Sequence, residues 1–150
     1  MIKLDSIDRK LIVLLGQDAS LSAEELAKRL SLSAVTIRRR LKKLLENNLV
    51  RIVGVVNASS IGYPILAIIA LDVASENISD AIDLLSKKQN VRFISTTTGR
   101  YDIIVMVRFQ SNDNISDFLL NDMAKIKGLR NSETFVCLQT RDFIRPFSTI

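Results

Sequence analysis

Residues 22–46 read SAEELAKRLSLSAVTIRRRLKKLLE, and this stretch decides the fold of the N-terminal part of the chain. Ser22 and Glu25 form the S-x-x-E pattern of a helix capping box, in which each side chain accepts a hydrogen bond from the other residue's backbone N–H. After a turn of three residues, Ser33 can cap a second helix with apolar residues at every third or fourth position. Those apolar residues are Ile37, Leu41 and Leu44. The stretch therefore predicts two helices joined by a tight turn.

A further helix is predicted before this stretch. Asp5 can cap its first turn, and Asp8 places a negative charge where the helix dipole favours one. Its apolar residues recur at helical spacing: Ile7, Leu11, Leu14 and Leu15. The two asparagines at 47–48 are expected to end the last of the three helices, because asparagine tolerates the left-handed conformation. Three helices with a tight turn between the last two are the helix-turn-helix pattern.

The last of these helices carries five cations within six positions. They are Arg38, Arg39, Arg40, Lys42 and Lys43. A solvated helix face normally mixes charges, whereas Arg38 with Lys42 and Arg39 with Lys43 are like-charged i,i+4 pairs that disfavour the helix. Residues 1–60 hold 11 Lys and Arg but 6 Asp and Glu, and residues 61–150 hold 10 of each kind, so the whole net charge of +5 lies in the N-terminal part. We interpret the basic helix as a surface for double-stranded DNA.

Helical geometry assigns a role to each residue of this surface. Val35 and Thr36 are expected against thymine methyl groups, and Arg38 and Arg39 towards guanine edges or phosphates. The other cations are expected to hold the DNA backbone, so that replacing Lys42 weakens all sequences alike while replacing Arg38 alters sequence preference. The candidate DNA-binding residues are Ser33, Val35, Thr36, Arg38, Arg39, Arg40, Lys42 and Lys43.

The rest of the chain repeats one pattern of strand, helix and strand. Strands are predicted over 65–73, 91–98, 101–109 and 134–141, and helices over 78–88 and 115–127. The same four residues, Asn-Ile-Ser-Asp, are expected to open both helices, at Asn77 and Asn114. The order β-α-β-β-α-β is the ferredoxin-like arrangement, an antiparallel sheet with two helices on one face. The fold class predicted for the chain is α+β.

Two features predict an assembly of identical subunits. The strands are apolar on both faces, and because the helices cover one face, the other is expected to meet a second subunit. Hydrophobic residues also make up 47% of a short chain that has limited interior volume. Residues 49–56, LVRIVGVV, are predicted as a further strand, followed by a linker at 57–62. The expected domains are a helix-turn-helix domain at 1–50, a linker strand and hinge at 51–62, and a ferredoxin-like oligomerisation and effector-binding domain at 63–150.

Several classes of protein are disfavoured by composition. The chain has no histidine and one cysteine, so it lacks the commonest general base and metal ligand and cannot form an internal disulfide. We therefore expect neither an enzyme nor a metal site. The first ten residues carry acids that a signal peptide avoids, and the longest apolar stretch, 65–71, is far shorter than a membrane span. A cytoplasmic protein is expected.

The order and spacing of these motifs resemble the Lrp/AsnC family of transcription regulators (leucine-responsive or feast/famine regulators) over nearly the full length. The matching residues are Leu4, Asp5, Asp8, Leu11 and Ile12; Glu25, Leu26 and Ala27; Leu32, Ser33, Thr36, Ile37, Arg40, Leu41 and Leu44; Leu49, Val50, Val53 and Gly54; Gly99, Arg100, Tyr101 and Asp102; and Gly128, Leu129 and Thr134. Ser31 and Asn48 stand where the family usually has glycine. The resemblance implies a winged-type helix-turn-helix domain followed by a ferredoxin-like RAM/ACT-like domain. It also implies nucleoid-associated homodimers, often assembled into octamers, that regulate amino-acid metabolism.

The resemblance also implies an effector site where residues 96–102 join the two central strands. In similar proteins this loop binds an amino acid at an interface between dimers. Backbone N–H groups near Gly99 would hold the α-carboxylate and Asp102 the α-ammonium, and the polar surroundings favour a polar effector such as glutamine. The candidate effector-binding residues are Thr98, Gly99, Arg100, Tyr101 and Asp102, with Thr134 and Thr140 from a neighbouring subunit. The alternative is a purely structural hairpin, because Gly99 and Arg100 fit a two-residue type II′ turn.

Three other functions compete with an effector-responsive regulator. An effector-independent architectural DNA-binding protein shares every feature except the effector site, and would protect DNA broadly rather than at defined sites. Haem-pathway decarboxylases resemble this build, but their chemistry calls for histidines that the chain lacks. RNA binding is disfavoured because residues 61–150 are neutral and their strands show no pair of stacking aromatics.

Overall fold

The computed structural model describes residues 3–139 of the 150-residue chain. Its contacts divide them into two units, one on each side of the boundary between Val55 and Val56. Each unit has its own hydrophobic core of fully buried side chains. No described helix is long and apolar enough to cross a membrane.

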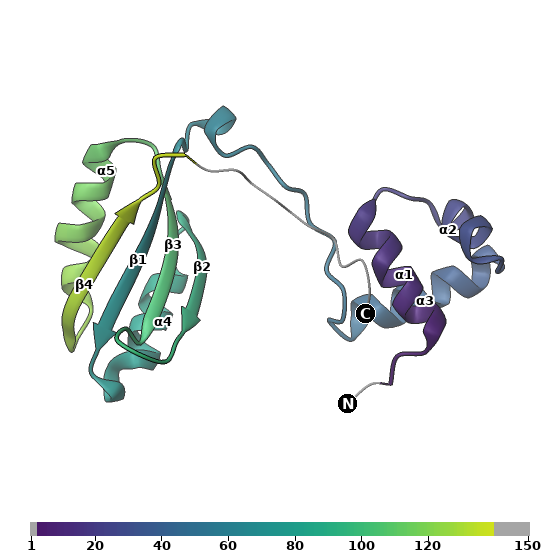
Figure 1. The fold of residues 1–150 in the computed structure, drawn as a ribbon, viewed down its shortest axis with the longest axis horizontal. Coiled ribbons are helices and arrows are strands. Elements are labelled where there is room, and N and C mark those ends of the chain that lie inside the picture. The colour runs from purple at the N-terminus through teal and green to yellow at the C-terminus, as the bar shows by residue number, and fades with distance from the viewer. Residues whose placement is uncertain (1–2, 140–150) are drawn as a thin grey trace. The chain divides into compact units, whose positions relative to one another are not determined.

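Three helices form the N-terminal unit: α1 (Ser6–Gln17), α2 (Ala23–Leu30) and α3 (Ala34–Glu46) (Figure 1). Leu11, Leu26 and Ile37 contribute one side chain from each helix to the centre of the core, where all three are fully buried. The predicted helix-turn-helix is confirmed, including the inward direction of the apolar stripe of α3. That stripe leaves the opposite face of α3 to its charged residues.

The helix ends follow from their capping residues. Asp5, Ser22 and Ser33 cap the three helices as predicted, and Ser22 with Glu25 forms the expected capping box. Asp5 also forms a capping box with Asp8, which the sequence pattern did not predict. The two positions that depart from the family's glycines, Ser31 and Asn48, have φ values of 55° and 53°. Both residues thus adopt the left-handed conformation that glycine accommodates without strain.

The segment at 49–56 differs from the prediction, because the structure has no strand there. A strand needs a neighbour to pair its backbone N–H and C=O groups. No strand within the described residues is paired with this segment. Its Val53, Val55 and Val56 side chains are between 62% and 69% exposed. Among residues 3–139, this segment of high β propensity is therefore unpaired, and its apolar side chains are exposed.

Four strands and two helices form the C-terminal unit. The strands are β1 (Ile65–Val73), β2 (Val91–Thr96), β3 (Ile103–Phe109) and β4 (Leu129–Val136), and short 3-10 turns lie at Ser59–Ile61 and Ser75–Asn77. Helix α4 spans Ile78–Ser86, and α5 (Asn112–Asp117) continues as a π-helical turn (Phe118–Asp122) and a 3-10 turn (Met123–Lys125). All strand pairs are antiparallel in the order β2-β3-β1-β4 (Figure 1). The predicted ferredoxin-like arrangement is confirmed.

The two faces of this sheet have different surroundings. Ile69, Val105 and their neighbours at alternate positions are buried against apolar residues of α4 and α5. The other face carries Ile68, which lies opposite Met106 on β3 and opposite Phe135 on β4. Phe93 lies beside the same Met106, and both Phe93 and Phe135 are 51% exposed. An apolar strip thus crosses all four strands on the face without helices, which we call the open face.

The element bounds differ most from their predicted positions in three regions of the C-terminal unit. Strand β4 begins at Leu129 rather than at 134 and ends before the predicted 141. Helix α5 begins at Asn112, because Ser111 caps it by accepting a hydrogen bond from the N–H of Asn114. The repeated Asn-Ile-Ser-Asp motif therefore opens α4 but lies inside α5. The third difference, at the turn between β2 and β3, concerns the expected effector site.

Candidate nucleic-acid interface and ligand loop

The outward face of α3 presents most of the predicted DNA-binding residues to solvent. Val35 is 72% exposed, and Arg38, Arg39, Lys42 and Lys43 are exposed as well. Ser33 and Thr36 lie at the start of the helix, where the Ser33 hydroxyl accepts a hydrogen bond of 3.2 Å from the Thr36 N–H. Their two hydroxyl oxygens lie 2.9 Å apart. The first turn of α3 is therefore capped by Ser33, and the exposed cations follow it along the helix.

The exposed cations of α3 differ in their partners. The Arg38 guanidinium forms an ion pair with Glu24 in the first turn of α2, with both side chains well exposed. Lys42 lies 3.7 Å from Glu46, which makes an i,i+4 pair of opposite charges. Among the described residues, Arg39 and Lys43 form no ion pair. These two side chains have their full charge available to an anion.

Arg40 lies differently from the prediction that grouped it with the DNA-facing cations. Its side chain is 20% exposed, and its Nη1 donates to Asp5 Oδ2 at 2.7 Å and to Asp8 Oδ1 at 2.6 Å. The hydrogen bonds that Arg40 donates to Asp5 and Asp8 raise the pKa of Arg40. The Asp8 N–H and the Arg40 guanidinium in turn lower the pKa of Asp5. Arg40 therefore ties α3 to the first turn of α1.

The turn between β2 and β3 is a six-residue loop, Thr97 to Asp102, and not the predicted two-residue type II′ hairpin. Thr97 closes the loop: its N–H donates to the Asp102 carbonyl at 2.9 Å and its hydroxyl to the Tyr101 carbonyl at 2.7 Å. A two-residue turn would need the Tyr101 carbonyl to accept from the Thr98 N–H, but it accepts from the Thr97 hydroxyl instead. The Asp102 backbone is bonded on both sides of β3, because its N–H also donates to the Leu71 carbonyl of β1 at 2.9 Å. Gly99 has φ 110°, so the glycine is required by the backbone as expected.

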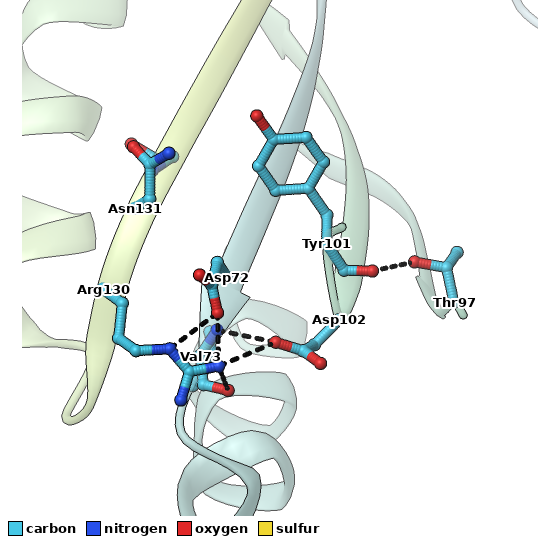
Figure 2. A network of polar contacts seen from close by, with 8 residues as sticks. Asp72, Val73, Thr97, Tyr101, Asp102, Arg130 and Asn131 are labelled. Carbon is cyan, nitrogen blue, oxygen red and sulfur yellow. Dashed lines mark hydrogen bonds and ion pairs between the residues drawn. The ribbon is translucent and has the colours of Figure 1, made fainter. Parts of the chain in front are cut away.

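Asp102 belongs to a polar network at the end of β1 (Figure 2). Its Oδ2 accepts a hydrogen bond of 2.9 Å from the Val73 N–H and lies 3.6 Å from the Arg130 guanidinium. Arg130 also donates from Nε to Asp72 Oδ1 at 2.8 Å and from its Nη2 to the Val73 carbonyl at 3.1 Å. The network joins the loop to β1 and β4, so the loop's position is fixed from two strands.

Tyr101 connects the same loop to the open face. Its hydroxyl donates to Glu133 Oε2 on β4 at 2.6 Å, and this hydrogen bond raises the pKa of the Tyr101 phenol. The Arg100 guanidinium carbon lies 5.2 Å from the centre of the Tyr101 ring, within cation–π range. The loop therefore gathers two cations and three carboxylates, together with a tyrosine, around one end of the sheet.

The other predicted effector residues are exposed in the loop, lie on the other face of the sheet or fall outside the described residues. Thr98, Gly99 and Arg100 are exposed, so one copy of the chain does not enclose a ligand at the loop. Thr134 pairs with Ile69 of β1, which places it on the helix-covered face, away from Tyr101. Thr140 lies outside the described residues. Asp72, Arg130 and Glu133 were missed, although Asp72, as the lone charged residue in an apolar strand, was a usable signal.

A separate hollow of about 200 Å3 opens at the opposite end of the sheet. Its lining combines Phe109 and Phe118 with polar side chains that include Tyr63 and Asn114. The π-helical turn of α5 contributes Asp122, whose pKa is lowered by its hydrogen bond with Lys88. This hollow shares no residue with the Thr97–Asp102 loop, so the two features are distinct.

Each of the two units matches a known protein family. Residues 4–45 match the AsnC-type helix-turn-helix domain, and residues 66–143 match the Lrp/AsnC ligand binding domain. An uncharacterized HTH-type transcriptional regulator of Pyrococcus furiosus is 31% identical over 134 residues, which cover 89% of this chain and 90% of that protein. The match thus extends through both units.

Solved structures share the arrangement of elements within this chain. The structure of E. coli AsnC superposes with a TM-score of 0.82 and 25% identity, over 96% of this chain and 100% of that one. A transcriptional regulator from Neisseria meningitidis, solved as a complex with L-Met, has a TM-score of 0.84 and 23% identity over 94% of each chain.

Proposed function

Because the chain belongs to the Lrp/AsnC family of DNA-binding transcription regulators, we propose that it binds specific DNA sequences through α3 and that an amino acid controls this binding. The observation that carries the proposal is the outward face of α3, where a capped first turn precedes exposed cations on a helix-turn-helix. In this proposal the N-terminal unit, up to residue 55, recognises DNA, and the C-terminal unit binds the ligand.

The roles proposed for α3 follow from exposure and pairing. Val35 and Thr36 face base edges and their methyl groups. Arg38, which is paired with Glu24, contacts a guanine. Arg39 and Lys43, which have no ion pair among the described residues, contact phosphates on the DNA backbone, and Lys42 joins them. Arg40 stabilises α3 through its ion pairs with Asp5 and Asp8.

The proposed active form is an assembly of identical chains. The apolar strip of the open face and the unpaired segment at 49–56 both leave apolar side chains exposed in a single copy. Strand pairing between two copies of that segment and packing between two open faces would bury both surfaces. We propose a homodimer as the basic unit and a higher oligomer, such as an octamer, as the form on chromosomal DNA.

The proposed effector is an amino acid held at the Thr97–Asp102 loop. Exposed backbone N–H groups around Gly99 suit its α-carboxylate. Asp102 suits the α-ammonium through Oδ1, which forms no hydrogen bond with the described residues. Because the loop residues are exposed in one chain, a second subunit would complete the site. The L-Met bound by the Neisseria regulator supports the ligand class, and glutamine is the first amino acid to test because the cluster is polar.

Lys42→Gln is expected to weaken binding to every duplex alike. Removing one phosphate contact should lower the slope of log Kobs against log salt concentration by about 0.9 for each copy bound. The measurement is fluorescence anisotropy at several salt concentrations, with a sequence first selected from a random duplex library by the unaltered protein. Arg92→Gln on β2, which removes an exposed cation from the other unit, is the control and should leave the slope unchanged. Failure of the unaltered protein to enrich any sequence would contradict specific recognition, and broad protection in a footprint would favour an architectural protein.

A selective amino-acid effector is expected to raise the midpoint of thermal unfolding, because a ligand that binds only the native state stabilises it. At a concentration 100 times its Kd the stabilisation is about 2.7 kcal/mol. The screen covers the twenty amino acids. In Asp102→Asn the shift should disappear, since the neutral amide binds an ammonium poorly, while Asp113→Asn at the start of α5 should keep it. An unchanged shift in Asp102→Asn would place the effector elsewhere.

A further inference from the structure

The first turn of α2 carries two neighbouring carboxylates with different tasks. Glu25 accepts hydrogen bonds from the Ser22 N–H at 2.8 Å and the Ser22 hydroxyl at 2.7 Å, so it belongs to the helix cap. Glu24 takes no part in the cap and instead forms the ion pair with Arg38 of α3. The side chain of Glu24 is 62% exposed and that of Arg38 is 58% exposed. The pair is thus a surface contact between the two helices of the helix-turn-helix.

Stability of the fold does not account for this pair. Ion pairs between exposed side chains contribute little to stability, and the α2–α3 contact already has buried Leu26 and Ile37. A carboxylate beside a DNA-binding helix also repels phosphates, and therefore lowers the affinity of the surface for DNA in general. Glu24 therefore lowers the general affinity for DNA, and a role for it must come from its effect on Arg38.

Arginine reads guanine through two parallel hydrogen bonds that need the planar guanidinium in one orientation. An unrestrained side chain has many rotamers, and ordering them on binding weakens the contact. Glu24 restrains the guanidinium of Arg38 in the free protein. By contrast, Arg39 and Lys43 have no such partner among the described residues, as suits contacts with phosphates.

We propose that Glu24 is a positioning residue for sequence recognition, which holds Arg38 for one base position and so raises discrimination while it lowers affinity for DNA in general. The inference rests on the proposed function, because it requires that α3 contacts DNA. Glu24 acts through Arg38 and touches no base itself. The base position that it governs is the one that changes when Arg38 is replaced.

The test uses the full chain and measures two dissociation constants, one for the sequence selected from a random library and one for a scrambled duplex. In Glu24→Gln the scrambled duplex should bind more tightly. The ratio of its dissociation constant to that of the selected sequence should fall up to about fivefold, because Arg38 remains but loses the restraint of an exposed ion pair. Glu46→Gln is the matched control, because it also removes a carboxylate paired with a cation of α3. It should raise general affinity without changing the ratio.

A double-variant cycle tests whether Glu24 acts through Arg38. The effect of Glu24→Gln on the ratio should vanish in an Arg38→Gln background, and selection by both single variants should relax preference at the same base position. An unchanged ratio in Glu24→Gln overturns the proposal. So does an effect that persists without Arg38, since Glu24 would then contact a base directly. Absence of any specific binding by the unaltered protein would instead refute the proposed function. Far-UV circular dichroism checks that each variant is folded.

Discussion

Arg40→Met is expected to lower the free energy of unfolding of the N-terminal unit by about 3 kcal/mol, the typical effect of removing one partner of a buried ion pair. The substitution keeps the length of the side chain but removes its charge. It leaves the Asp8 carboxylate, which is 4% exposed, without its cation. It also removes the link between α3 and the first turn of α1, so the three-helix arrangement itself is weakened. Urea unfolding followed by circular dichroism measures the loss.

Arg39→Met provides the matched control, one position earlier on the same helix. Arg39 is exposed and has no ion pair among the described residues, so its replacement should change stability by less than about 0.5 kcal/mol. It should nevertheless weaken DNA binding. Hydrogen exchange locates the effect: Arg40→Met should accelerate exchange in α1, α2 and α3 and leave β1 unchanged. Equal stability of the two variants would show that the buried pair contributes nothing, and restored stability in Asp8→Asn with Arg40→Met would confirm that the unpaired carboxylate is the cause.

The loss in Arg40→Met is also expected to depend on pH. The Asp8 N–H and Arg40 hold the pKa of Asp5 below its ordinary value in the folded chain. Their stabilisation is therefore complete above the ordinary aspartate pKa of about 3.9 and is lost as the pH falls through the lower, folded value. The difference between the two proteins should be full at pH 7 and should shrink below pH 4. A difference that grows in acid would contradict this account.

Gly128→Ala is expected to destabilise the C-terminal unit by about 3 kcal/mol, from left-handed strain of about 1–2 and crowding of about 1–3. Gly128 precedes β4 and has φ 70°. A Cβ atom there would lie 2.5 Å from Asn77 Nδ2 and 2.9 Å from the Ala74 Cβ. The backbone cannot move away freely, since the Gly128 carbonyl accepts a hydrogen bond of 2.8 Å from the Ala74 N–H. Thermal unfolding measures the effect.

Three variants separate strain from crowding in this prediction. Gly54→Ala meets nothing within 4 Å and needs no left-handed backbone, so it should be nearly neutral. Gly99→Ala has open space but φ 110°, and should show strain alone. Asn77→Ala combined with Gly128→Ala should recover the part of the crowding that is due to the Asn77 side chain. If Gly128→Ala were no worse than Gly99→Ala, the close approach of Asn77 would have no energetic weight.

Local capping signals were readable from the sequence because they act over three or four residues. Ser22, Ser33 and Asp5 each cap the helix that their spacing predicted. The start of α5 was missed because its cap, Ser111, is followed by an asparagine at the third position instead of the glutamate of a capping box. The start of β4 was missed for a related reason: Arg130 to Glu133 are polar and have low β propensity, and only pairing with β1 makes them a strand.

Contacts between residues far apart in the sequence could not be predicted from local sequence patterns. The run of five cations on α3 looked uniform, but Asp5 and Asp8, more than 30 positions away, draw Arg40 inward. The two-residue hairpin at Gly99 and Arg100 was a reasonable local reading. It was wrong because the Tyr101 carbonyl accepts from the Thr97 hydroxyl and not from the Thr98 N–H. Residues 49–56 have strand propensity but pair with no strand of the described part of the chain, so propensity alone could not make them a strand.

The strand order β2-β3-β1-β4 also has a consequence for how the C-terminal unit is made during synthesis. When β1, α4 and β2 have left the ribosome, the two strands are present but are not neighbours, because each pairs with β3. The two strands of the second copy, β3 and β4, are also not neighbours, since each pairs with β1. Neither copy can form a hydrogen-bonded sheet alone, so folding of this unit waits for almost all of its residues. A gene divided between the two copies would yield two fragments, each of which supplies the strand that the other lacks.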